Sequence, residues 1–184
     1  MSDINGIPRE LFLELLSKYY STKDLRSLGL DERQLAKFLR AVNSHIGIPD
    51  GSPGVGVIVD KRSGAQILYM SGDGAKALAT GRGICQEQIW AHRDTLPNGT
   101  YLVEYGYRSR MGEVYIDTVG SKCVELTKKG KDGEYPNTEA IGNAAMMAET
   151  KARRRGIKDL CQTGMIDESE LDSVPDFQIV NKAK

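Results

Sequence analysis

The chain has 184 residues with 25 basic and 25 acidic side chains, so its formal net charge is zero. This length is typical of one domain, and 40% hydrophobic residues indicate a folded rather than a disordered protein. A neutral total excludes a uniformly basic nucleic-acid-binding protein. Any nucleic-acid contact must therefore come from a local row of basic side chains.

The sequence also argues against a membrane protein and against a disulfide or zinc scaffold. No run approaches the roughly 18 apolar residues of a membrane span, and the first ten residues lack the features of a signal peptide, so we expect a cytoplasmic protein. Cys85, Cys123 and Cys161 lie far apart without a CxxC pair. We interpret them as small buried hydrophobic residues.

Two amphipathic helices are predicted at the start of the chain. Apolar residues recur there at i and i+3/i+4, the spacing that places them on one helical face. The first helix follows Pro8, and the second follows Asp31, which has the side chain of an N-cap. The predicted helices cover residues 9–20 and 32–46.

Five strands are predicted after the loop at residues 47–54. They are rich in β-branched and aromatic residues and are joined by glycine-containing turns, which is typical of antiparallel pairing. A short helix at residues 72–83, closed by a glycine, separates the second strand from the third. The predicted strands cover residues 55–61, 65–71, 84–94, 100–109 and 113–125.

The longest predicted helix covers residues 138–164, with Asn137 or Thr138 as its N-cap and Gly164 at its end. The polar segment 128–137 before it is interpreted as a linker. One face of this helix consists mostly of small side chains, so it can approach a sheet closely. The residues of this face are Ile141, Ala145, Ala148, Ala152, Gly156 and Leu160.

This order of elements predicts an α+β fold. We expect one antiparallel β-sheet of about five strands packed against the long C-terminal helix, with two N-terminal helices. In this interpretation the protein is a single domain: residues 1–50 form a helical segment packed on a core of residues 51–172, and residues 173–184 form a tail.

Four basic residues of the long helix stand at i, i+3, i+4 and i+7 and so form one row beside its small-residue face. A basic row beside a packed face lines a groove and favours an anion such as a phosphate backbone. The alternative is a solvated surface that complements the helix dipole. The row consists of Lys151, Arg154, Arg155 and Lys158.

The strand at residues 100–109 offers a second candidate surface. Its alternation places Tyr101, Tyr105 and Tyr107 on one face, with Arg108 and Arg110 near the following turn. Aromatic rings beside arginines suit the stacking of single-stranded bases. The alternative is a tyrosine-rich core face beneath the long helix, and Tyr115 on the next strand is open to both interpretations.

Other chemistries have weaker support. The segment GDGAKA at residues 72–77 has the spacing of a dinucleotide-binding loop, but no βαβ unit follows it, so we interpret it as a strand-to-helix turn. No phosphate-binding loop of an ATPase is present. A nuclease would need clustered carboxylates, and Asp60, Glu104, Glu113 and Asp117 have no recognised catalytic spacing. We expect no catalytic residues, metal or cofactor.

Three stretches carry a resemblance to a known family: AQILYMSGDGAKALATGRGI, YLVEYGYRSRMGEVYIDTVG and AAMMAETKARRRGIKDLCQTGMIDESELD. Over about residues 55–172 their order resembles the phage single-strand annealing proteins of the RecT/Erf/Red-beta superfamily, whose core is shared with the eukaryotic annealing recombinase. In the eukaryotic relatives the long helix carries a Lys-Arg-x-x-Arg pattern in the inner DNA groove. Arg154, Arg155 and Lys158 fit that spacing.

The resemblance implies ATP-independent binding and annealing of single-stranded DNA in phage recombination, by a ring or filament of many copies in the host cytoplasm. Expected partners are single-stranded DNA, the annealed duplex, further copies of the chain, and a phage exonuclease or host single-strand-binding protein. Two alternatives remain: a metal-dependent nuclease using Asp60, Glu104 or Asp117, and a scaffold whose basic row binds an acidic partner. The expected DNA contacts are Lys151, Arg153, Arg154, Arg155, Lys158, Arg108, Arg110, Tyr105 and Tyr107.

Overall fold

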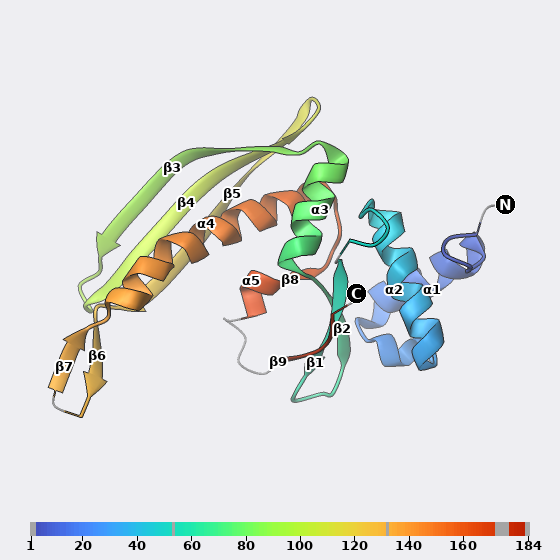
Figure 1. The fold of residues 1–184 in the computed structure, drawn as a ribbon, viewed down its shortest axis with the longest axis horizontal. Helices are drawn as coiled ribbons and strands as arrows, with labels where there is room; N and C mark the ends of the chain where they lie inside the picture. Colours follow the sequence, from blue (N-terminus) through green and yellow to red (C-terminus); the bar gives the residue numbers. More distant parts are fainter. Residues whose placement is uncertain (1–2, 53, 132, 172–176, 183–184) are drawn as a thin grey trace. The chain divides into compact units, whose positions relative to one another are not determined.

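The fold is α+β, as the sequence predicts, with two N-terminal helices and one long helix late in the chain (Figure 1). The computed structural model describes residues 3–52, 54–131, 133–171 and 177–182, the last range by its backbone. The chain divides into two compact units, residues 1–83 with 163–184 and residues 84–162. The expected boundaries after residues 50 and 172 therefore do not match these units, because the N-terminal helices share a unit with the first β-hairpin.

The first unit begins with α1 (Arg9–Thr22) and α2 (Glu32–Ile46), joined through a short 3₁₀ helix, η1 (Leu25–Leu28). Asp31 is the N-cap of α2, as predicted: its side chain accepts a hydrogen bond from the Gln34 backbone, and the Gln34 side chain accepts one from the Asp31 backbone. The two helices pack through Phe12 and Phe38, whose ring centroids lie 5.8 Å apart.

The sheet of the first unit has the strand order β8-β2-β1-β9. The hairpin of β1 (Val55–Asp60) and β2 (Gln66–Met70) is confirmed. Antiparallel pairing adds β9 (Phe177–Lys182) to β1, and parallel pairing adds β8 (Ile166–Asp167) to β2, before the short helix α5 (Glu168–Leu171). Part of the expected tail is thus a strand, whereas residues 173–176 and 183–184 lie outside the described residues.

The expectation of one five-stranded sheet is wrong. Both edges of the β1–β2 hairpin are occupied. Strand β9, from the expected tail, pairs with β1, and β8, which follows the long helix, pairs with β2. A strand has only two hydrogen-bonding edges, so no edge of the hairpin remains for the later strands. These form a separate sheet in the second unit.

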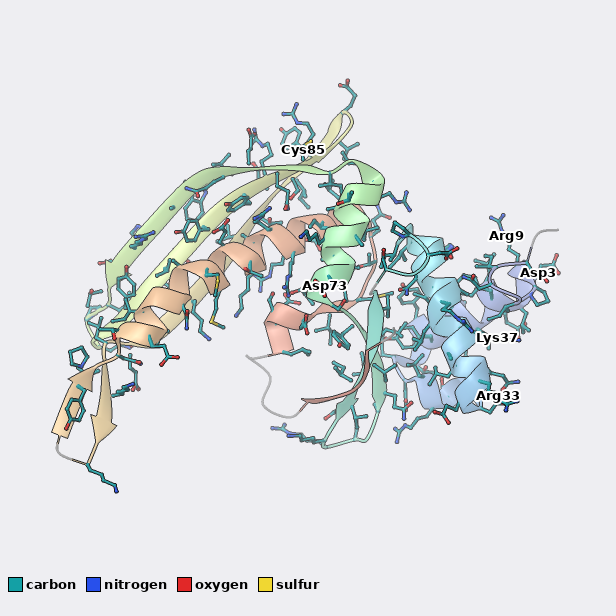
Figure 2. The ribbon with its side chains drawn as sticks, viewed as in Figure 1. Asp3, Arg9, Arg33, Lys37, Asp73 and Cys85 are labelled. Carbon is teal, nitrogen blue, oxygen red and sulfur yellow. The ribbon has the colours of Figure 1, made fainter. Side chains whose placement is uncertain are left out.

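Helix α3 (Gly72–Arg82) starts with the GDGAKA segment, and Figure 2 labels Asp73 at its N-terminal end. The Ser71 side chain accepts a hydrogen bond from the Gly74 backbone, and the Glu168 carboxylate accepts one from the Gly72 backbone. Gly74 also packs against the backbone of Gly54. Protein groups therefore occupy this helix start, and the segment is the strand-to-helix turn that the sequence favoured.

The second unit is an antiparallel sheet with one face covered by a long helix (Figure 1). Its strands are β3 (Cys85–Thr95), β4 (Thr100–Met111) and β5 (Val114–Glu125), in that spatial order. Helix α4 (Thr138–Leu160) ends four residues before the predicted Gly164. Asn137 holds the N-cap position, but its side chain makes no capping bond and donates instead to the Glu125 carbonyl.

Helix α4 lies close to the sheet because small residues meet at the contact. Gly120 of β5 leaves room for the α4 backbone at Ala148 and Ala152, and Gly156 of α4 faces Ser109 and Thr118. Thr118 donates a 2.7 Å hydrogen bond to the Ala152 carbonyl. The predicted small-residue face is partly corrected: Ala148, Ala152 and Gly156 are buried as expected, whereas Ala144 joins them and Ile141, Ala145 and Leu160 are half-buried.

The expected linker is wrong: strands β6 (Thr127–Gly130) and β7 (Gly133–Pro136) pair there as a second hairpin. The interpretation of the cysteines is also wrong for two of the three, since Cys85 (labelled in Figure 2) and Cys123 are exposed. Cys161 is half-buried. Within the described parts of the chain, none of the helices is long and apolar enough to cross a membrane.

Candidate nucleic-acid interface

The sheet of the second unit has a helix face, which packs against α4, and an open face on its other side. Val103, Tyr105 and Tyr107 lie on the helix face in one cluster with Ala144, Ala148 and Ala152. Tyr105 and Tyr107 are only 7% and 8% exposed. The alternative of a tyrosine-rich core face is therefore confirmed, and α4 covers the two rings that the sequence offered for base stacking.

The hydroxyl groups of these tyrosines have partners on α4 and on the neighbouring strand β3. Tyr107 donates a 2.8 Å hydrogen bond to the Glu149 carboxylate, and Arg93 donates one of 2.9 Å to the Tyr105 oxygen. Burial, with the neighbouring Glu149 carboxylate, raises the pKa of Tyr107 to about 12. Both rings thus have a structural role in joining helix to sheet.

The predicted basic row runs along the side of α4 that borders β5. Lys151 is 7% exposed, so the prediction that it lies beside the packed face is corrected: its stem is part of that face, against Gly120. One turn later, Arg155 donates a 2.9 Å hydrogen bond to the Val119 carbonyl of β5. Arg154 and Lys158 are half-buried on the same helix.

Arg153 lies on the other side of α4, toward β3. Its Nε donates to the Gln86 side chain over 3.3 Å, and its guanidinium lies 3.6 Å from the Glu149 carboxylate. The guanidinium also lies 5.8 Å from the centroid of the Tyr107 ring. Gln86 in turn donates to the Arg153 carbonyl. These contacts hold Arg153 against the sheet, apart from the row.

Arg108 and Arg110 lie on the open face, as shown by their alternation with the buried Tyr107 and Ser109. Two 2.7 Å hydrogen bonds join Arg108 to the Asp117 carboxylate, and the guanidinium lies 4.6 Å from the centroid of the Tyr115 ring. The hydrogen bonds raise the pKa of Arg108 and lower that of Asp117. The structure therefore does not bring these arginines together with the α4 row.

Charge is segregated between the two sides of this sheet. Among the described residues, strand register and helix position place seven basic and three acidic side chains on the helix side. The open face of residues 85–124 carries two basic and four acidic strand side chains instead. The helix side holds Arg93, Lys122, Lys151, Arg153, Arg154, Arg155 and Lys158 with Glu139, Glu149 and Asp159; the open face holds Arg108 and Arg110 with Glu87, Asp94, Glu104 and Asp117.

A groove of about 460 Å³ lies between the end of β5 and the first half of α4. Lys122 lines it and faces the helix side, because it pairs with the buried Val103. Glu125 and Glu139 also line the groove, so this end has mixed charge. Lys122 was not predicted from the sequence, although its place in the alternation of β5 could have identified it.

Two exposed aromatic residues were not assigned from the sequence: Trp90 was not considered, and Tyr115 was left between a stacking surface and the core. Trp90 and Tyr115 are 41% and 56% exposed. The Trp90 ring lies over Gly106, which has no side chain to obstruct it. A register shift between Gln88 and Trp90 sets the side on which Trp90 lies, and this irregularity has no clear signature in the sequence.

The carboxylates considered for a nuclease are separated by the fold. Asp60 belongs to the first unit, where it accepts hydrogen bonds from the Arg62 backbone and the Ser63 hydroxyl, which lower its pKa. Glu104 and Asp117 lie on the open face, and Glu113 lies in the β4–β5 turn. No group of three or more His, Cys, Asp or Glu residues suited to a metal ion occurs in the described part of the chain.

Comparisons of the chain with protein-family models, curated proteins and solved structures found no match. The resemblance to the single-strand annealing proteins therefore stays a prediction.

Proposed function

We propose that the protein binds single-stranded DNA along the α4–β5 side of its second unit and anneals complementary strands without ATP. The observation that carries this proposal is the segregation of charge across the sheet, with the basic excess on the α4 side. Residues 151–158 span about 10 Å of helix. The row thus fits a short stretch of backbone.

The proposed mechanism needs no bond-making chemistry. Arg154, Arg155 and Lys158 hold the phosphates, and the bases stay free to pair with a second strand. Lys151 is buried against the sheet and adds its charge to the same side of the helix. Phosphate contacts position the strand, and the complementary strand supplies sequence specificity. Tyr105 and Tyr107 are buried under α4, so the proposed binding of DNA does not depend on bases stacking on these two rings.

Weak contacts per subunit imply that many subunits act together. The few accessible cations of one subunit release few counterions, which gives modest affinity at physiological salt, whereas linked sites gain affinity by avidity. We therefore propose a homo-oligomer, a ring or a filament, that acts in recombination in the cytoplasm of a phage host. Light scattering should show many subunits with DNA affinity that falls steeply as salt rises; a monomer both free and DNA-bound would contradict this.

An annealing assay tests the proposed activity. Complementary labelled oligonucleotides should pair faster with the protein than without it, and adding ATP should not change the rate. Adding Mg²⁺ should leave both strands intact on a denaturing gel. Shorter fragments that appear only with metal would favour the nuclease over the annealing protein.

A further inference from the structure

The β6–β7 hairpin is a defined structural element with two different faces. Lys128 lies directly opposite Tyr135, and Lys129 lies opposite Glu134, so alternation places these two pairs on opposite faces. The Tyr135 ring lies across Gly130, where an added Cβ would stand 2.6 Å from the ring. One side of the ring therefore packs against Gly130, and Tyr135 remains 42% exposed.

The β6–β7 hairpin is connected at both ends to residues that line the groove beside α4. Glu125 immediately precedes Leu126 and the hairpin, Asn137 immediately follows it, and both line the 460 Å³ groove. The Asn137 side chain donates to the Glu125 carbonyl, which ties the two ends of the hairpin together. Figure 1 shows the hairpin projecting beyond the end of the β3–β5 sheet, next to the start of α4.

The charge and chemistry of one hairpin face match a single nucleic-acid strand. Lys128 and Tyr135 place a cation beside a supported, exposed ring, and Lys131 adds an exposed cation in the turn. Aromatic rings stack on bases of any sequence, and nearby lysines contact the phosphates. On the other face, Glu134 opposite Lys129 offsets the positive charge.

We propose that the β6–β7 hairpin is a second contact for single-stranded DNA, in which Tyr135 stacks on one base and Lys128 and Lys131 hold adjacent phosphates. This inference rests on the proposed function of the α4 row and extends it. The strand would run from the hairpin past Lys122 to the row on α4. One stacked base per subunit would set the register of the backbone in the groove.

The test compares a thymidine oligonucleotide of about eight residues with an abasic strand of the same length. In fluorescence anisotropy, Tyr135→Ala should weaken binding of the thymidine strand about tenfold and leave binding of the abasic strand unchanged. Tyr135→Phe should bind both strands as the natural protein does. Equal binding of the thymidine strand by Tyr135→Ala and the natural protein would overturn the stacking contact, as would equal losses with both strands.

A matched lysine pair tests the choice of face. Lys128→Ala should reduce the dependence of log affinity on log salt by about 0.7, whereas Lys129→Ala should change it by clearly less. Equal changes would overturn the assignment of the contact to one face. If the proposed function is wrong, the natural protein will bind neither oligonucleotide. If only the hairpin contact is wrong, the natural protein will bind and all hairpin variants will bind equally well.

Discussion

The two faces of the β3–β5 sheet are built from the same strands but differ in packing and in charge. The helix face buries Val103, Tyr105 and Tyr107 under α4 and borders the basic row. On the open face Trp90 and Tyr115 are exposed, and most of the charged side chains around them are acidic. Because successive side chains alternate, a shift of one position would exchange these roles. Strand register therefore decides which residues are available to a partner.

The faces also differ in how closely a neighbour approaches the backbone. On the helix face, Gly120 meets backbone atoms of Ala148 and Ala152, which a rigid helix cannot move aside. On the open face, the atoms nearest to a Cβ at Gly106 belong to the ring of Trp90, an exposed side chain that can rotate. Substitutions of glycine on the two faces should therefore differ strongly in cost.

Gly120→Ala should have the largest effect on stability. Its new methyl group would overlap the α4 backbone, so the second unit should lose about 3 kcal/mol of its free energy of unfolding. Urea unfolding followed by the fluorescence of Trp90, the single tryptophan of the chain, measures this unit directly.

Gly142→Ala is the control within α4. A Cβ at Gly142 would meet nothing within 4 Å, so alanine should stabilise the helix by up to about 1 kcal/mol. Equal destabilisation by the two substitutions would contradict the close approach of α4 at Gly120.

Tyr107→Phe should have an intermediate effect. Loss of the hydrogen bond to Glu149 should cost about 1 kcal/mol at neutral pH. The folded pKa of Tyr107 is raised from 10 to about 12, so its contribution is present below pH 10 and is lost as the pH rises through 12. Spectrophotometric titration of the variant should lack one tyrosine that ionises near pH 12; loss of a tyrosine that ionises near pH 10 instead would contradict the buried pairing.

Gly106→Ala should have the smallest effect on stability, within about 0.5 kcal/mol, because the nearest atoms belong to the exposed Trp90 side chain, which can move. The displaced ring should change the emission spectrum of Trp90. A loss of stability as large as that of Gly120→Ala would show that the two faces do not differ as described.

Much of the fold follows from local patterns in the sequence. Helical spacing and the Asp31 capping residue predicted α1 and α2, and alternation predicted all three strands of the second unit. The pairing of β9 with β1 was not predictable in this way, because long-range partners leave no local pattern. The lysines and glycines of residues 128–133 were interpreted as a linker, although a glycine-containing turn between short polar segments is also compatible with a hairpin.

The candidate site was predictable in part. The spacing of the basic residues on α4 follows from helical geometry alone, and the row lies on that helix as expected. The alternation of β4 correctly separated Tyr105 and Tyr107 from Arg108, but it could not say which face α4 would cover. The choice depended on Gly120 and on the small residues of α4, whose partners are set only by tertiary packing.

Charge reversal on the two sides of the sheet tests the central claim most directly. Arg154→Glu/Arg155→Glu changes the α4 side, and Arg108→Glu/Arg110→Glu makes the same change of charge on the open face. Circular dichroism establishes that both variants are folded, and anisotropy with a labelled single-stranded oligonucleotide measures affinity. The account predicts a loss of about a hundredfold for the α4 pair, from two charge-assisted contacts, and a much smaller loss for the open-face pair. Unchanged affinity in the folded α4 variant, or an equal loss in both, would contradict it.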